Sequence, residues 1–130
     1  MTPAILIAAI LASPIGFWSS GHGENAGRIE IKACGEALCG YIIDAARFQV
    51  EPDQRDVRNH DPALRDRPIR GLVVLENFAG GPPVWSGAGY DPRWGLRAKN
   101  VKLRLVSPDV MKIRGCLAIF CLTQTLYRVQ

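Results

Sequence analysis

The feature that most constrains the fold is a series of short segments in which apolar and polar residues alternate, separated by glycine, proline and aspartate. Residues 28–33 (RIEIKA) are the clearest example, because strict alternation places Ile29, Ile31 and Ala33 on one face of a half-buried strand. Beyond residue 13, no segment has a convincing helical period. The pattern predicts strands over residues 16–20, 28–33, 38–45, 72–76, 84–88, 96–105, 110–114 and 123–129.

Strands of this number and length are typical of a closed up-and-down antiparallel barrel, in which no strand is left at an edge, and also of a β-sandwich. A chain of 130 residues has room for one such domain, and we place it at residues 14–130. The pattern therefore predicts a single all-β domain of one of these two architectures.

The longest predicted strand contains a change of parity in its charged residues. Arg97 and Lys99 share one face of the strand, whereas Lys102 and Arg104 share the other. One extra residue in the strand would return all four to a single face. We therefore expect a β-bulge near Asn100.

The amino-terminal segment carries no charged side chain through residue 23 and contains a short apolar stretch, AILIAAILA, at residues 4–12. This stretch indicates a secretory signal peptide over residues 1–13, although a buried first helix or strand is the alternative. No apolar run approaches the roughly 18 residues needed to span a bilayer, so we expect no transmembrane segment. The predicted location is periplasmic or secreted.

The four cysteines form two pairs with four intervening residues each, Cys34 with Cys39 and Cys116 with Cys121. Four cysteines allow three pairings, which sequence alone does not distinguish. Because each pair lies at a predicted strand–turn–strand junction, local bridges are sterically easy and agree with export. The competing interpretation is a zinc site built from all four. We expect two local disulfides and no metal site.

Two features at opposite ends of the chain carry a family resemblance: Gly16-Phe17-Trp18 in the first predicted strand and Arg128 in the last. This combination resembles the lipocalin and wider calycin pattern. The resemblance implies an eight-stranded antiparallel up-and-down lipocalin-like barrel. It also implies that Trp18 packs against Arg128 and closes one end of the barrel.

The chain also resembles a bacterial secreted family called domain of unknown function 2147. The resemblance covers almost the whole predicted domain, and Leu126 and Tyr127 depart from the family's closing Q-T-W-T-R motif. The matching segments are CGEALCGYI, NHDPALRDRPIRGLVVL, GYDPRWG and RGCLAIFCLTQTLYRV. It implies a lipocalin-like barrel and an exported location, but no established reaction.

The interior of a small eight-stranded barrel has space for packed side chains or for one small ligand. By analogy with the fold, we expect an exported protein that binds a small apolar or amphipathic molecule without a cofactor. Each candidate lining residue is also suited to an ordinary core. The candidates are Phe78, Trp85, Tyr90, Met111 and Ile113.

A long segment between predicted strands provides the alternative function. Residues 51–70 contain five acidic residues, five arginines and three prolines, and loops of this length in compact domains are usually functional or mobile. The protein would then be a cell-envelope interaction protein without a ligand cavity. Arg65 and Arg67 are the candidate residues of that partner surface.

An enzyme is the least favoured class. A histidine base is available only at His22 or His60, and no catalytic residue is predicted. Catalysis would need an accessible cluster of His60 with Asp56 and Asp61. The D-x-x-N-x-D spacing of Asp56, Asn59 and Asp61 differs from that of an EF-hand loop, and we expect Asp61 to cap the turn before Pro62 instead of binding a cation.

Charge is distributed unevenly along the chain. Residues 93–130 hold eight basic side chains and one acidic side chain, a net charge of +7, whereas residues 1–92 hold eight basic and eleven acidic ones, a net charge of −3. This basic carboxyl-terminal third fits an anionic surface of the cell envelope, and the alternative is a solvated outer face of two strands. Nucleic acid is not expected, because no aromatic residues are interleaved for base stacking.

Overall fold

The computed structural model describes residues 13–21, 23 and 26–129. Residues 1–12 and His22 lie outside the described residues. The signal peptide expected over residues 1–13 and any role of His22 therefore stay predictions.

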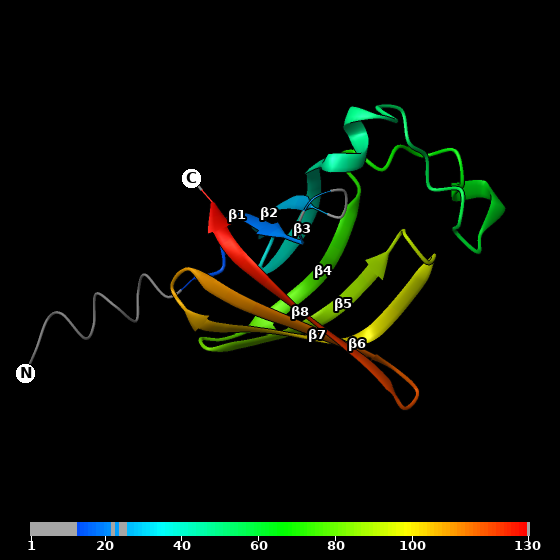
Figure 1. Cartoon of the computed structure of the whole chain (residues 1–130). Coiled ribbons are helices and arrows are strands. Elements are labelled where there is room, and N and C mark those ends of the chain that lie inside the picture. Colours follow the sequence, from blue (N-terminus) through cyan, green and yellow to red (C-terminus); the bar gives the residue numbers. More distant parts are fainter. Residues whose placement is uncertain (1–12, 22, 24–25, 130) are drawn as a thin grey trace, which may run out of the picture.

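Eight antiparallel strands form one closed barrel in which each strand pairs with its neighbours in sequence and β1 pairs with β8 (Figure 1). This confirms the predicted all-β fold class and excludes the sandwich. Every predicted segment corresponds to one strand. The strands are β1 (Gly16–Ser20), β2 (Gly27–Cys34), β3 (Ala37–Ala45), β4 (Val73–Gly80), β5 (Val84–Asp91), β6 (Leu96–Ser107), β7 (Val110–Leu117) and β8 (Phe120–Val129).

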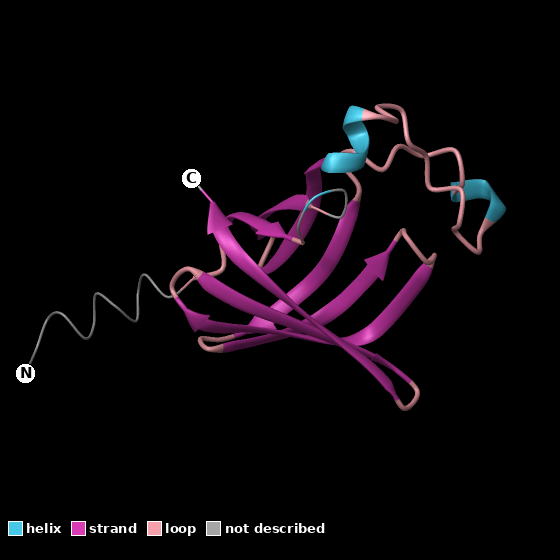
Figure 2. Cartoon of the chain, viewed as in Figure 1, coloured by secondary structure: helices cyan, strands magenta, loops and turns pink. Residues whose placement is uncertain are grey.

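The connections between strands divide the barrel into two ends. One end, called here the loop end, carries the β3–β4 loop at residues 46–72, the β5–β6 turn at residues 92–95 and the β7–β8 turn at residues 118–119 (Figure 1). Two short 3-10 helices, η2 (Ala46–Gln49) and η3 (Pro62–Leu64), lie in the β3–β4 loop (Figure 2). The opposite end, called the closed end, holds the β2–β3, β4–β5 and β6–β7 turns.

Inward-facing apolar side chains fill the barrel. The void lined by Ile31, Leu75, Phe78 and Leu103 has no space for a water molecule. The buried core consists of Trp18, Ile31, Leu75, Phe78, Trp85, Val101, Leu103, Leu105, Met111 and Leu126. The interior is therefore occupied by the protein's own side chains, as small eight-stranded barrels allow.

The expected irregularity in β6 is present. The register between β5 and β6 shifts between Gly87 and Gly89, where β6 has one extra residue. Lys99 and Asn100 are consecutive and both exposed, so the inward-facing parity of β6 changes at this point. The change of parity in the sequence therefore located a β-bulge correctly.

Both expected local disulfides are present. Cys34 is bonded to Cys39 across the β2–β3 turn, and Cys116 is bonded to Cys121 across the β7–β8 turn. Each bond links two strands that are already adjacent. Among the described residues, no helix is long and apolar enough to cross a membrane.

At the closed end, the structure brings Trp18 and Arg128 together. The two residues are paired between β1 and β8, and the Arg128 guanidinium lies 4.4 Å from the centre of the Trp18 ring. Gly16 permits this contact, because a Cβ atom at that position would lie 2.5 Å from Nη1 of Arg128. The amino-terminal and carboxyl-terminal strands thus meet at one site.

Candidate functional site

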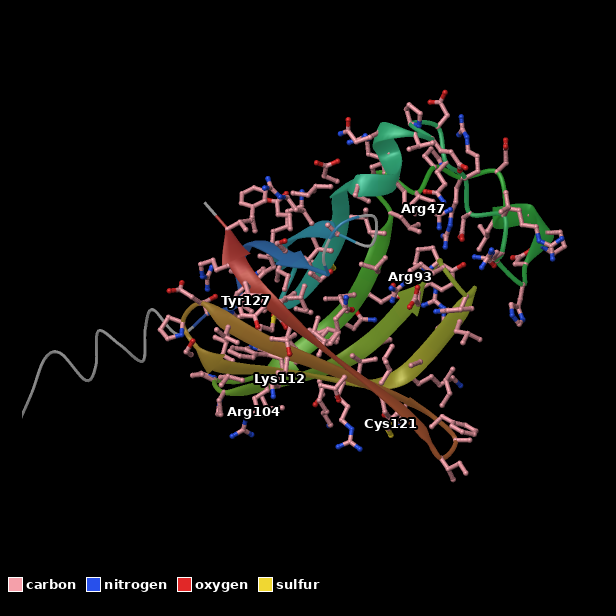
Figure 3. All side chains as sticks on the ribbon, in the orientation of Figure 1. Arg47, Arg93, Arg104, Lys112, Cys121 and Tyr127 are labelled. Atoms are coloured by element: carbon pink, nitrogen blue, oxygen red, sulfur yellow. A yellow bond between two sulfur atoms is a disulfide. The ribbon has the colours of Figure 1, made fainter. Side chains whose placement is uncertain are left out.

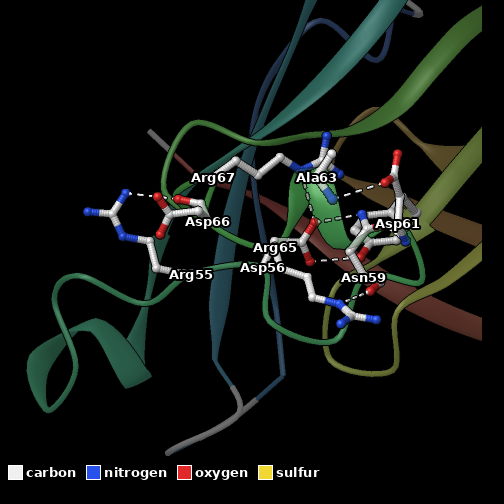
Figure 4. Close-up of polar contacts among 9 residues, drawn as sticks. Arg55, Asp56, Asn59, Asp61, Ala63, Arg65, Asp66 and Arg67 are labelled. Carbon is white, nitrogen blue, oxygen red and sulfur yellow. Dashed lines mark hydrogen bonds and ion pairs between the residues drawn. The ribbon is translucent and has the colours of Figure 1, made fainter.

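The β3–β4 loop is fastened to the barrel through the buried carboxylate of Asp56. This carboxylate accepts hydrogen bonds from Nδ2 of Asn59 at 2.9 Å, from Nε of Arg67 at 2.9 Å and from the hydroxyl of Tyr90 at 2.7 Å. Figure 4 shows the contacts within the loop. Tyr90 belongs to β5. The Asp56 side chain therefore both orders the loop and attaches it to the barrel wall.

The electrostatics of this cluster favour an ionised Asp56. Burial opposes ionisation, but the hydrogen bonds from Asn59, Tyr90 and Arg67 and the positive charge of Arg67 outweigh it, and the pKa of Asp56 lies below its ordinary value. Burial, followed by the hydrogen bond to Asp56 and its negative charge, raises the pKa of Tyr90 to about 12. At neutral pH, a neutral phenol therefore donates to a charged carboxylate.

Local turn chemistry shapes the tip of the loop. Oδ1 of Asp61 accepts a hydrogen bond from the backbone N–H of Ala63 at 3.0 Å and caps η3 at Pro62, as expected from the sequence. Nε of Arg65 donates to the backbone oxygen of Asn59 at 2.7 Å. The tip is therefore held by side chains of its own residues.

The loop also contacts the β5–β6 turn. Nη1 of Arg58 donates to the backbone oxygen of Arg93 at 2.6 Å. Gly95 has a φ of +65°, and a Cβ atom there would lie 1.9 Å from the backbone oxygen of Arg58. Glycine at position 95 thus allows the loop and the turn to approach closely.

A groove of about 430 Å³ lies at the loop end, between the tip of the loop and the first residues of β6. Its walls combine apolar side chains with ionisable ones. The lining residues are Asn59, His60, Asp61, Leu64, Tyr90, Gly95, Leu96, Arg97 and Leu117. A concave surface with both apolar and polar walls can contact the two parts of a small amphipathic molecule.

The five predicted ligand-lining residues separate into two groups. Phe78, Trp85 and Met111 belong to the buried barrel core, and Ile113 packs against it. Tyr90 belongs to a second buried apolar cluster, formed with Phe48, Ile69 and Leu72 beneath the β3–β4 loop, and it also lines the groove. Tyr90 is therefore the member of the set that lies at an accessible concave surface.

Asp56, Asn59 and Asp61, the residues considered for a cation site, hydrogen-bond to one another or to the loop backbone. Asn59 Oδ1 accepts from the backbone N–H of Asp61 at 2.8 Å, and both oxygens of Asp56 accept hydrogen bonds. His60 and Asp61 are exposed, whereas Asp56 is buried. In the part of the chain that the structure describes, no group of three or more histidine, cysteine, aspartate or glutamate side chains is placed to hold a metal ion.

The two arginines predicted as a partner surface have contacts inside the loop. Arg67 pairs with Asp56, and Arg65 binds the backbone of Asn59. The groove residues Leu64, Leu96, Arg97 and Leu117 were not predicted, because their grouping depends on how the loop folds over the barrel end. The sequence gives only one local signal for these residues, which is that Leu64 and Leu96 are apolar residues next to charged ones.

Comparisons with known proteins agree with this architecture. The solved structure of protein HP1028 from the human pathogen Helicobacter pylori, described as belonging to the lipocalin family, is similar to this chain, with a TM-score of 0.76 and 18% sequence identity. The match covers 92% of this chain and 84% of that one. A search of the curated proteins gave no match. The family model DUF2147, described as an uncharacterized protein conserved in bacteria, matches residues 16–128, and the chain belongs to this family.

Proposed function

We propose that the protein binds a small amphipathic molecule in the groove at the loop end. The observation that carries the proposal is the contrast between the filled barrel and the groove of about 430 Å³ beside Tyr90. The lipocalin-like fold supports small-ligand binding by analogy. Binding at the rim requires no rearrangement of the buried core.

The groove fits a molecule with an apolar body and an anionic group. Leu64, Leu96 and Leu117 provide the apolar contacts. Arg97 forms an ion pair with Glu76, and both side chains are close to half exposed. Because an exposed ion pair contributes little net stability, a ligand carboxylate can replace Glu76 as the partner of Arg97 at small cost.

Titration with a dansyl-labelled undecanoic acid, followed by fluorescence, tests the proposal. We expect Leu64→Glu and Leu96→Glu to weaken probe binding about tenfold or more, because each change replaces an apolar side chain that would contact the probe with a charge that repels its carboxylate. Val106→Glu is the matched control, since Val106 is an exposed apolar residue of β6 near the closed end. Wild-type affinity in both groove variants would contradict binding in the groove.

We further propose that the protein is exported to the periplasm or secreted. Two disulfides support this location, because disulfides persist in oxidising compartments and are rare in the cytosol. The uncharged segment at residues 1–13 is the proposed export signal.

A fusion of residues 1–13 to alkaline phosphatase lacking its own signal tests the export proposal. We expect phosphatase activity in the periplasmic fraction, because the enzyme is active only where its disulfides form. Replacing Ile5 and Ile7 with aspartate should abolish this activity by interrupting the apolar stretch. An inactive fusion retained in the cytoplasm would refute the signal.

A further inference from the structure

The tip of the β7–β8 hairpin is an exposed apolar surface. Residues 115–122 contain no charged side chain. Ile119 is 88% exposed, Phe120 is 77% exposed and Leu122 is 61% exposed. The hairpin extends outward at the loop end (Figure 1). Contiguous apolar side chains exposed to this extent mark interaction surfaces in soluble proteins.

The tip is exposed because it continues the inward-facing side of the barrel beyond the barrel rim. Leu117 has the same strand parity as the buried Met111, and Phe120 and Leu122 have the same parity as the buried Leu126. The Cys116–Cys121 disulfide joins the two strands of the tip. Apolar residues suited to burial are thus held in place where none of the described strands covers them.

A second exposed aromatic residue lies at the same end. Trp94, in the β5–β6 turn, is 62% exposed. Tryptophan is enriched where proteins meet the headgroup region of a bilayer, because its ring is apolar and its N–H donates a hydrogen bond. Trp94 and the tip together give the loop end the composition of an interfacial anchor.

A basic strip made by side chains of β6 and β7 runs along the outer face of the barrel, from the base of the tip to the β6–β7 turn at the closed end. Its members are Lys99, Lys102, Arg104, Lys112 and Arg114, and none of them has a salt-bridge partner among the residues that the structure describes. Figure 3 shows Arg104 and Lys112 on these strands. From position 93 onward, the sequence contains a single acidic residue, Asp109. β6 and β7 themselves therefore contribute no acidic side chain to this face.

Like charges face each other across the two strands of the basic strip. Lys102 is paired with Arg114, and Arg104 is paired with Lys112. Like charges directly opposite one another destabilise a sheet. A sheet that keeps two such pairs gains most from a partner whose surface carries many negative charges.

We infer that the β7–β8 tip and the basic strip dock the barrel on an anionic phospholipid membrane. The tip would enter the interface, and lipid phosphates would neutralise the paired cations. Val101 pairs with Gly115, so Lys99 lies beside the base of the tip, and Arg114 precedes it on β7. Leu117 of the tip also lines the groove, whereas Ile119 and Phe120 do not, so substitutions at Ile119 and Phe120 test membrane docking without changing the groove lining.

Sedimentation with vesicles tests the inference, using phosphatidylethanolamine vesicles with and without phosphatidylglycerol. We expect the protein to bind the anionic vesicles, and added salt to weaken binding because ions screen surface charges. Lys99→Gln/Arg114→Gln should weaken binding about 25-fold, since each cation near an anionic surface strengthens binding about fivefold. The matched control is Arg28→Gln/Lys32→Gln, which removes the same charge from β2 on the opposite side of the barrel.

The apolar contribution has its own variant pair. Ile119→Ser/Phe120→Ser should weaken vesicle binding about tenfold or more, because binding strength scales with the apolar area that enters the interface. Ile15→Ser/Val106→Ser is the control, since both residues are exposed apolar residues of the closed end. Circular dichroism verifies that each variant is folded.

Three outcomes would overturn the inference. The first is equal wild-type binding to vesicles with and without phosphatidylglycerol, and the second is undiminished binding by the Ile119→Ser/Phe120→Ser variant. The third is failure to bind vesicles together with a dimer in sedimentation velocity that the same variant dissociates. That third result would show that the tip is an interface between two copies of the chain.

Discussion

Replacing Trp18 with alanine is expected to lower the free energy of unfolding by about 3–5 kcal/mol, the range typical of deleting a large buried aromatic side chain. Trp18 is fully buried in the barrel core. Its ring nitrogen donates a hydrogen bond to the backbone oxygen of Pro14 at 2.8 Å. The substitution therefore removes apolar contacts and leaves a carbonyl group without its donor.

Arg128 increases the expected cost of that substitution. Its guanidinium lies over the Trp18 ring and donates to the backbone oxygens of Ile15, Ser13 and Pro108 at 2.8, 2.8 and 2.9 Å. The planar guanidinium suits several carbonyls at once while its face rests on an aromatic ring. Without the indole, this cation would face a cavity at the junction of the first and last strands.

Urea unfolding followed by far-ultraviolet circular dichroism, with the disulfides intact, measures the effect. Trp94→Ala is the control, since the same side chain is deleted from an exposed turn. We expect the control to lose less than about 1 kcal/mol, as surface substitutions usually do. A loss of that small size for Trp18→Ala would show that this residue does not hold the barrel closed.

The fold was predictable because its determinants are local. Each strand has its own period-two pattern and its own turn residues, and the β6 bulge is visible as a change of parity between Lys99 and Lys102. The pairing of Trp18 with Arg128 joins residues far apart in sequence, and family resemblance supplied it. The start of β8 at Phe120 was missed, because its first residues extend past the barrel and lack alternating burial.

The candidate site was less predictable because it depends on contacts distant in sequence. Asp56 was considered as a cation ligand, but its hydrogen bond to Tyr90 links residues separated by 34 positions. No local pattern marks such a pair. Likewise, Leu64 and Leu117 come to line one groove only after the long loop has folded onto the barrel end.

Asp56→Ala is expected to lower the free energy of unfolding by about 3 kcal/mol, because removing one partner of a buried ion pair leaves the other groups uncompensated. The Asp56 side chain is buried, whereas that of Arg67 is 30% exposed. Partial hydration of Arg67 places the expected cost at the lower end of the usual range. The hydroxyl of Tyr90 would also lose its acceptor inside the second apolar cluster.

Low pH should release the β3–β4 loop from the barrel. The folded state lowers the pKa of Asp56 below 3.8, so the carboxylate contributes stability above that pH and loses it as the pH falls through the lower, folded-state pKa. Protonation of the Asp56 carboxylate removes its charge attraction to Arg67. It also turns one carboxylate oxygen into a hydroxyl group, which is a poorer hydrogen-bond acceptor. In Asp56→Ala, this component of the acid dependence should be absent.

Hydrogen exchange of the loop amides distinguishes loop release from global unfolding. The N–H of Asp56 bonds to the oxygen of Arg67, and the N–H of Ile69 bonds to that of Gln54, each at 3.0 Å. Asp56→Ala should reduce protection of these amides far more than that of the β6–β7 amides, because local opening exposes the loop alone. Asp53→Ala is the matched control, since Asp53 is an exposed carboxylate of the same loop. Full protection of the loop amides in Asp56→Ala would show that the apolar cluster of Phe48, Ile69, Leu72 and Tyr90 holds the loop without the carboxylate.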